Sequence, residues 1–126
     1  MTFTEIQQQF SFCKSWEERY RLLIQLSRTL PKPGDEELAS IPEIHGCESR
    51  LWFAFQREPF SIQAYSDARL MQGILAIIIA LLHEKSDEIR EELDLQAVFD
   101  ELKIAKHLTS TRLIAIQQIN RLIREA

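Results

Sequence analysis

Residues 50–64 read RLWFAFQREPFSIQA, and this stretch decides the fold class. The run from Leu51 to Phe55 is dense in aromatic side chains, which is typical of a strand packed on at least one face. After a turn that contains Pro59, apolar and polar residues alternate from Phe60 to Ala64, which is the period of a half-buried strand. The sequence therefore predicts two antiparallel strands joined by a short turn.

The strongest apolar run follows this hairpin, from Leu70 to Leu82, and its apolar residues cover more than one helix face. That breadth predicts a deeply buried helix, and Ser66 and Asp67 stand where they can cap it. Gly73 lies inside the helix, at a cost on the order of 1 kcal/mol relative to alanine. We therefore expect Gly73 to pack closely against another backbone, with the sheet as the expected surface.

Caps and apolar spacing mark further helices on both sides of the hairpin. Thr2 with Glu5, and Ser15 with Glu18, have the spacing of capping boxes, and Thr109 can N-cap a C-terminal helix. The apolar stripes that follow these caps are Phe3, Ile6 and Phe10; Tyr20, Leu23, Leu26 and Leu30, ended by Pro31; and Leu113, Ile116, Ile119 and Ile123.

Two more helices, a loop and a short strand complete the predicted order of elements. A short acidic helix is expected after Ser86, followed by a second one from Leu95 to about Lys103. The segment from Pro31 to Pro42 holds three prolines and an acidic run, so it predicts a surface loop. A third short strand is expected just before Cys47. Helices around a small antiparallel sheet of about three strands make this an α+β protein.

Composition describes an ordinary globular protein. The 126 residues predict a single domain, residues 1–126, and 45% hydrophobic content with a net charge of -4 makes nucleic acid an unexpected partner. The N-terminus lacks a basic region followed by an apolar core, so a cytoplasmic location is expected. The run from Leu70 to Leu82 is too short to span a bilayer, so no membrane role is expected.

Cys47 is the candidate functional residue. It follows Gly46, which permits a turn or a close approach, and it precedes a rigid strand, where reactive side chains are commonly presented. A lone cysteine is most often a small buried hydrophobe, so composition alone favours that reading. His45, two residues away, would point to the same side in an extended segment and could polarise the thiol.

Other chemistries have weaker support in the sequence. Cys13 and Cys47 lie far apart and form no Cys-x-x-Cys pair, so both are expected to be free thiols, with Cys13 in the core. The histidines and cysteines lack the paired spacing of a structural zinc site. A cysteine hydrolase would need an oriented base and an oxyanion hole, and the sequence indicates neither. A peroxide sensor would need Cys13 to come close as the resolving cysteine.

The chain resembles the SufE family of sulfur-acceptor proteins over nearly its whole length. The most specific part is Ile44-His45-Gly46-Cys47-Glu48-Ser49-Arg50-Leu51-Trp52, which is similar to the family's signature around the sulfur-accepting cysteine. Further similar motifs, in the same order, are Trp16-Glu17-Glu18-Arg19-Tyr20 with Leu30-Pro31, Ser66-Asp67-Ala68, and His107-Leu108-Thr109-Ser110-Thr111-Arg112.

The resemblance implies a mechanism in which Cys47 takes a persulfide sulfur from a cysteine desulfurase and hands it onward. It implies a carrier and desulfurase activator rather than an autonomous enzyme, with no cofactor of its own, because pyridoxal phosphate belongs to the partner. The expected downstream acceptor is an iron-sulfur scaffold, and a tRNA or cofactor sulfuration route is the alternative destination of the sulfur. An alternative function for the chain is a non-covalent adaptor that binds the desulfurase without accepting sulfur. A monomer or weak dimer is expected.

By the same matching, supporting or partner-binding positions are His45, Gly46, Glu48, Ser49, Arg50, Asp67 and Arg112. Asp67 and Arg112 correspond to polar positions near the cysteine loop, and Arg112, near the start of the last helix, could help stabilise the thiolate.

The chain departs from the family pattern at three positions. Glu48 stands where glutamine is frequent, Ser110 where proline is frequent, and Ala115 where glycine is expected. If the side chains are close, the negative charge of Glu48 should disfavour the Cys47 thiolate and raise the pKa of that thiol.

Overall fold

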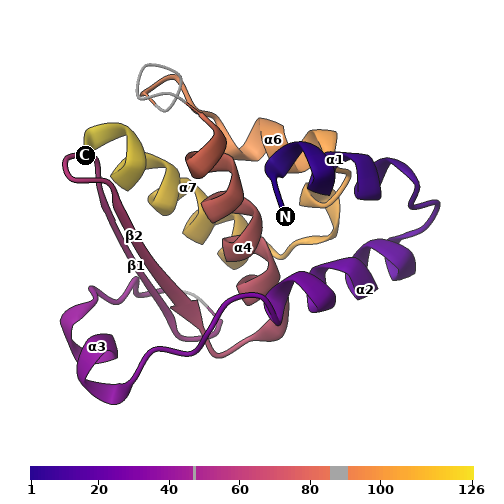
Figure 1. The fold of residues 1–126 in the computed structure, drawn as a ribbon. Coiled ribbons are helices and arrows are strands. Elements are labelled where there is room, and N and C mark those ends of the chain that lie inside the picture. Colours follow the sequence, from indigo (N-terminus) through magenta and orange to yellow (C-terminus); the bar gives the residue numbers. More distant parts are fainter. Residues whose placement is uncertain (47, 86–90) are drawn as a thin grey trace.

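The predicted hairpin forms the sheet of the protein. In the computed structural model, which describes residues 1–46, 48–85 and 91–126, strand β1 (Leu51–Gln56) pairs antiparallel with strand β2 (Ser61–Ser66). The register places Leu51 opposite Ser66 and Gln56 opposite Ser61. Leu51 and Phe53 on one face of β1 are completely buried in the core. Helices pack around this hairpin, which confirms the α+β class (Figure 1).

The expected third strand is reduced to a single bridge. Glu43 forms an isolated antiparallel bridge with Trp52, flanked by backbone hydrogen bonds from Ile44 N to Leu51 O at 2.8 Å and from Phe53 N to Pro42 O at 3.0 Å. Pro42 has no N–H to donate, which limits pairing at the start of this segment. The segment before the cysteine therefore follows the edge of β1 without becoming a strand among the described residues.

Helix α4 (Arg69–Glu84) lies at the centre of the molecule, with the hairpin on one side and helices α1 (Phe3–Ser11) and α2 (Trp16–Ser27) on the other (Figure 1). The predicted deep burial is confirmed, because every residue from 71 to 78 is buried. The predicted cap is wrong. The N-cap is Ala68, which makes no side-chain cap, and Ser66 and Asp67 bond to other groups described below.

Gly73 is where α4 and α2 touch backbone to backbone. A Cβ at this position would overlap the carbonyl group of Leu23 and lie 3.2 Å from Leu23 Cα. The prediction of close backbone packing is therefore confirmed, but the expected surface was wrong, because Gly73 faces α2 and not the sheet. Two helices can approach this closely only where one of them has no side chain in the way.

The N-terminal helices largely follow their predicted caps. The capping box of α1 is complete, whereas Ser15 caps α2 by accepting from Glu18 N while the Glu18 carboxylate accepts from Lys14 N. Tyr20 does not belong to the buried stripe of α2, because its side chain is exposed. The segment from Pro31 to Pro42 is not only a loop, since it contains the short helix α3 (Asp35–Ser40).

The C-terminal part packs across the sheet and α4. It comprises α6 (Leu95–Glu101), the 3-10 turn η1 (Ala105–His107) and α7 (Ser110–Glu125), which Thr109 N-caps as predicted. The predicted acidic helix after Ser86 falls mainly on residues 86–90, outside the described residues. Arg57 in the hairpin turn donates from Nη2 to Ile123 O at 3.1 Å, which ties the hairpin to the end of α7.

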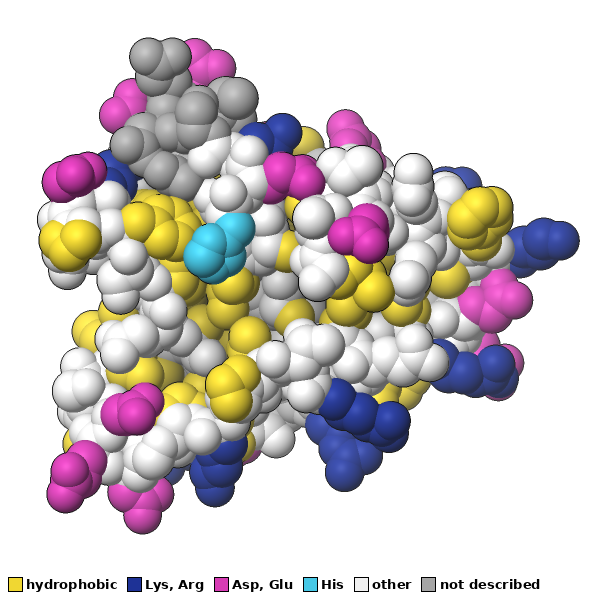
Figure 2. All heavy atoms as spheres, viewed as in Figure 1, with side chains coloured by type: hydrophobic (Ala, Val, Ile, Leu, Met, Phe, Trp, Pro, Cys, Tyr) yellow, Lys and Arg dark blue, Asp and Glu magenta, His cyan; other side chains and the backbone are white. Residues whose placement is uncertain are grey.

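The face in Figure 2 carries an apolar hollow between the hairpin and the helices. A cavity of about 560 Å³ lies between the N-terminus, the end of α2 and α4, and its apolar lining includes Leu30, Ala76, Ile79 and Ala80. No helix in the described part of the chain is long and apolar enough to cross a membrane.

Candidate functional site

The candidate nucleophile Cys47 lies outside the described residues, and its neighbours on both sides are described. Gly46 has a φ of 91°, in the left-handed region that side chains other than glycine's rarely adopt. Nothing lies within 4 Å of where a Cβ would stand, so the backbone conformation, and not a lack of space, calls for glycine here. The chain thus turns sharply at the residue before Cys47.

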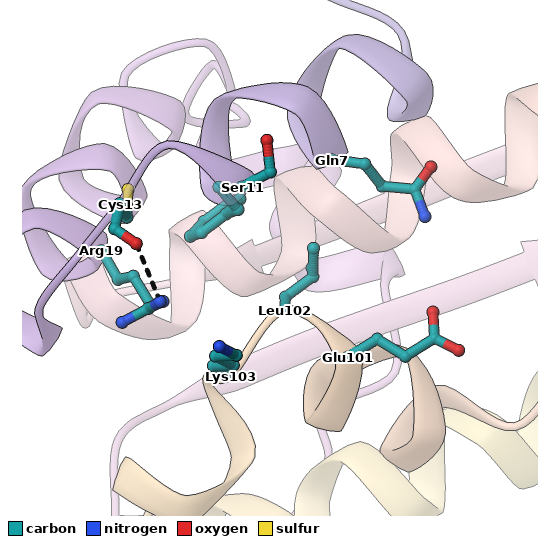
Figure 3. Close-up of a pocket in the computed structure, with 8 residues that line it drawn as sticks. Gln7, Ser11, Cys13, Arg19, Glu101, Leu102 and Lys103 are labelled. Atoms are coloured by element: carbon teal, nitrogen blue, oxygen red, sulfur yellow. Dashed lines mark hydrogen bonds between the residues drawn. The ribbon is translucent and has the colours of Figure 1, made fainter.

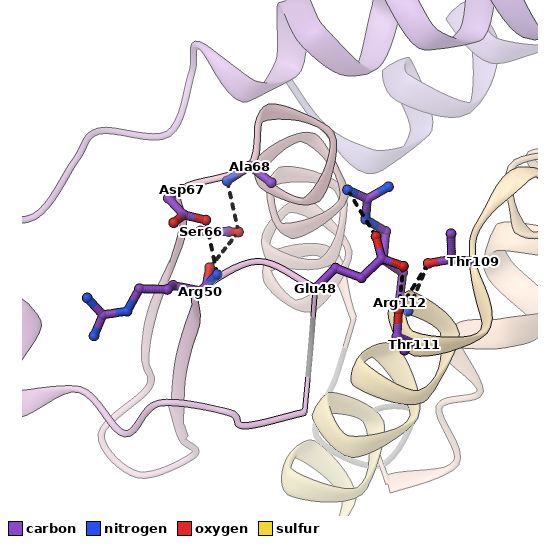
Figure 4. A network of polar contacts seen from close by, with 8 residues as sticks. All are labelled: Glu48, Arg50, Ser66, Asp67, Ala68, Thr109, Thr111 and Arg112. Carbon is purple, nitrogen blue, oxygen red and sulfur yellow. Dashed lines mark hydrogen bonds and ion pairs between the residues drawn. The ribbon is translucent and has the colours of Figure 1, made fainter.

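The far side of this turn is fastened through the backbone of Arg50. Asp67 Oδ1 accepts a hydrogen bond from Arg50 N at 3.0 Å, and Ser66 Oγ donates to Arg50 O at 2.7 Å (Figure 4). Ser66 is buried, and its Oγ also accepts from Ala68 N at 3.3 Å. The residues that the sequence indicated as helix caps therefore join the end of the cysteine turn to the start of α4.

The side chain of Arg50 is held by Glu43 and Trp52. Its Nε and Nη2 donate to the two carboxylate oxygens of Glu43 at 3.1 and 3.0 Å, and its guanidinium carbon lies 4.6 Å from the centre of the Trp52 ring. The hydrogen bond from Arg50 lowers the pKa of Glu43 below its usual range and raises the pKa of Arg50. Arg50, a predicted supporting residue, therefore joins Glu43, in the segment before Cys47, to Trp52 on β1.

Glu48, the residue after Cys47, is bound to the start of α7. Thr111 Oγ1 donates to Glu48 Oε1 at 2.6 Å, and Arg112 Nη2 lies 3.8 Å from Glu48 Oε2 (Figure 4). Thr109 Oγ1 stands 3.2 Å from Thr111 Oγ1 and extends this polar group. The hydroxyls of Thr109 and Thr111, together with Arg112, hold the pKa of Glu48 below its usual value of 4.5.

Arg112 combines this contact with partial burial. Its side chain is 21% exposed, and its Nε is buried without an acceptor among the described residues. The structure therefore brings Glu48, the residue after Cys47, together with Arg112 at the start of α7. Whether Arg112 also stabilises a Cys47 thiolate stays a prediction, because the thiol is outside the described residues.

The remaining predicted positions differ in their exposure. His45 is exposed, and no hydrogen bond or ion pair joins it to a described residue, whereas Ser49 is half-buried. His107 stacks on Trp16 with ring centres 4.3 Å apart and so serves as a packing partner next to α7. The described residues contain no group of three or more histidine, cysteine or acidic side chains placed to hold a metal ion.

Cys13 contrasts with the candidate site. It is half-buried rather than fully in the core, and its thiol donates to Gln9 O at 3.6 Å. Burial raises the pKa of the Cys13 thiol, which keeps it protonated at neutral pH and makes it a poor nucleophile.

Sequence reasoning missed two functional partners, Glu43 and Thr111. Glu43 carries no local signal, because its side chain meets Arg50 only when the backbone of Glu43 lies opposite Trp52. Thr111 was visible only as part of a motif at the start of α7. Its position in the first turn of a helix, where donors gather, was the available hint.

Comparisons with known proteins agree with this architecture. A family model described as the Fe-S metabolism associated domain, SufE, matches residues 4–126. A protein of Haemophilus influenzae described as an uncharacterized SufE-like protein is 35% identical over 120 residues, which cover 93% of this chain and 95% of that relative. The expected resemblance is thereby confirmed: the chain belongs to the SufE family.

Proposed function

We propose that the protein accepts sulfur from a cysteine desulfurase on Cys47, stimulates the desulfurase and passes the sulfur to iron-sulfur cluster assembly. Membership of the SufE family supports a sulfur-acceptor role in iron-sulfur metabolism in general. The observation that carries the finer proposal is the fastening of the chain close to Cys47. After Cys47, Thr111 binds Glu48, and Asp67 and Ser66 bind the backbone of Arg50; before it, Ile44 N donates to Leu51 O. These contacts join the described residues next to Cys47 to a rigid scaffold, where reactive side chains are commonly presented.

The proposed transfer is a thiol exchange without net oxidation. The Cys47 thiolate attacks the terminal sulfur of the desulfurase persulfide, a new S–S bond forms at Cys47, and the S–S bond to the desulfurase cysteine breaks. The desulfurase cysteine leaves as a thiolate. The proton that Cys47 gives up before the attack is matched by the proton that this released thiolate takes up. The step needs no cofactor in this chain, since pyridoxal phosphate acts earlier, in the partner, to generate the persulfide.

The fastened turn gives the supporting residues distinct parts in this proposal. Gly46 sets the direction of the chain before Cys47, and Asp67 and Arg50 hold the chain after it. Glu48 is drawn to the α7 donors, so its negative charge is partly balanced by Arg112 instead of standing alone beside the thiol. We further propose that the protein works in the cytoplasm as a monomer or weak dimer.

The test is to incubate the protein with the desulfurase and cysteine and to weigh it by mass spectrometry under non-reducing conditions. We expect one added sulfur atom on the wild type and on C13S, and none on C47S. Cys13 is the matched control, because its raised pKa should make it unreactive. Wild-type protein without the added sulfur would contradict the proposal, and full stimulation of the desulfurase by C47S would favour a non-covalent adaptor.

A further inference from the structure

Arg19 is a buried cation that forms no ion pair with a carboxylate among the described residues. Its residue is only 8% exposed, and its Nη2 donates to Cys13 O at 3.0 Å. Its Nε is shielded from solvent and has no acceptor, and no carboxylate in the described part of the chain forms an ion pair with it. A buried charge is costly unless it is paired, so this guanidinium calls for an explanation.

The guanidinium lines a cavity of about 380 Å³ between the end of α1, the start of α2 and the end of α6. Its polar lining consists of Gln7, Ser11, Cys13, Arg19, Glu101 and Lys103. Figure 3 shows Arg19 reaching from α2 toward the turn that carries Lys103, with Gln7 on the α1 side. Two cationic side chains from separate elements therefore share one cavity.

Lys103 holds an unusual backbone conformation at this cavity. Its φ is 61°, in the left-handed region, where it terminates α6 with a hydrogen bond from its N–H to Asp100 O at 3.0 Å. Glycine is the usual residue at such a helix end, because any side chain is disfavoured there. Lysine at this position places an ammonium group on the cavity wall, and no described carboxylate pairs with it.

The charges around the cavity do not cancel. Glu101 is the one carboxylate in its lining, it is exposed, and no ion pair joins it to Arg19 or Lys103. The carbonyl of Cys13, just past the end of α1, offers Arg19 only the partial charge of a helix C-terminus. Arg19 and Lys103 therefore leave the cavity with a positive excess.

We propose that this cavity binds an oxyanion of the phosphate or sulfate type between Arg19 and Lys103. The guanidinium offers its Nη donors beyond the one that binds Cys13 O, and its charge favours an oxyanion, while the Lys103 ammonium adds a mobile point charge. Gln7 can donate its amide N–H from the α1 side. The cavity has room for an organic group beyond the anion, so inorganic phosphate and a phosphomonoester share the required chemistry. This site is separate from the cysteine turn.

The test follows the Arg19 Nε–H signal of the full chain by ¹⁵N NMR, with R19K used to assign that signal. Sodium phosphate and glycerol phosphate are titrated separately against sodium chloride of the same ionic strength. We expect a saturable shift with phosphate and none with chloride. A larger affinity for glycerol phosphate would identify an ester as the better ligand, whereas equal affinities would assign binding to the phosphate group alone.

Two lysine variants distinguish specific phosphate binding in the cavity from non-specific attraction of phosphate to a positively charged surface. K103Q is expected to weaken phosphate binding about tenfold, because one of the two charge-assisted contacts is lost. K106Q is the matched control, since Lys106 is exposed and lies outside the cavity lining. No shift beyond that in chloride, or equal weakening in both variants, would overturn the proposal. Because no desulfurase is present, the result is independent of sulfur transfer.

Discussion

The contacts of Glu48 with α7 partly balance its negative charge. Its carboxylate accepts from Thr111 and faces Arg112 at the start of α7, where helix donors favour a negative charge. A glutamine could accept from Thr111 as well, but it would bring no charge to Arg112. The glutamate in this chain thus adds an electrostatic bond between the cysteine turn and α7.

The first prediction concerns the titration of Glu48. Its pKa is lowered in the fold, so the contact with α7 contributes stability above the unfolded value of 4.5 and loses it as the pH falls through the lower folded value. A ¹³C titration of the Glu48 carboxyl should therefore give a midpoint below 4.5. The Thr111 amide should shift with the same midpoint.

The control for this prediction is E48Q, in which the Thr111 amide should no longer titrate with that midpoint. A Glu48 midpoint at or above 4.5 would show that the α7 contact is absent in solution.

At the scale of the elements, the contact between α2 and α4 depends on Gly73. We predict that G73A lowers the free energy of unfolding by about 2 kcal/mol, because the overlap with the Leu23 carbonyl outweighs the gain of about 1 kcal/mol in helix propensity. Urea unfolding followed by circular dichroism measures this loss.

G34A is the matched substitution, since nothing lies within 4 Å of a Cβ at Gly34. Its free energy of unfolding should stay within about 0.5 kcal/mol of the wild type. Equal free energies of unfolding for G73A and the wild type would mean that α2 and α4 are too far apart for a Cβ at residue 73 to overlap the Leu23 carbonyl.

The elements also show what the sequence could predict. The caps of α1 and α7, the hairpin and the buried face of α4 depend on spacing within one segment, and these were predicted correctly. Helix α3 was missed because it has no buried residue and therefore no apolar period. The partner of Gly73 and the Glu43–Arg50 pair depend on which segments meet in space, which local spacing does not specify.

At the scale of the whole molecule, the buried side chains come from the sheet and from helices that precede and follow it in the sequence. Residues of α1, α2, β1, α4, α6 and α7 belong to the same hydrophobic cluster. A core shared in this way should unfold cooperatively. The prediction that residues 1–126 form a single domain can be tested on that basis.

Two single-tryptophan variants provide the probes. In W52F the fluorescence reports on Trp16, which stacks on His107, and in W16F it reports on Trp52, which stacks on Tyr65. For each variant we predict that fluorescence and far-UV circular dichroism give the same urea midpoint and slope. Separate midpoints within one variant would indicate two independently unfolding units.

The hydrogen bond from Ile44 N to Leu51 O also limits how far the chain between these two residues can extend from the sheet. While it holds, the chain from 44 to 51 is a closed loop, and half of its contour at about 3.5 Å per residue spans roughly 12 Å. No part of the backbone between these two residues can therefore lie more than about 12 Å from the start of β1. Any molecule that exchanges an atom with residue 47 must come to this edge of the sheet, so its own reactive group has to sit at a surface or at the mouth of a shallow cleft.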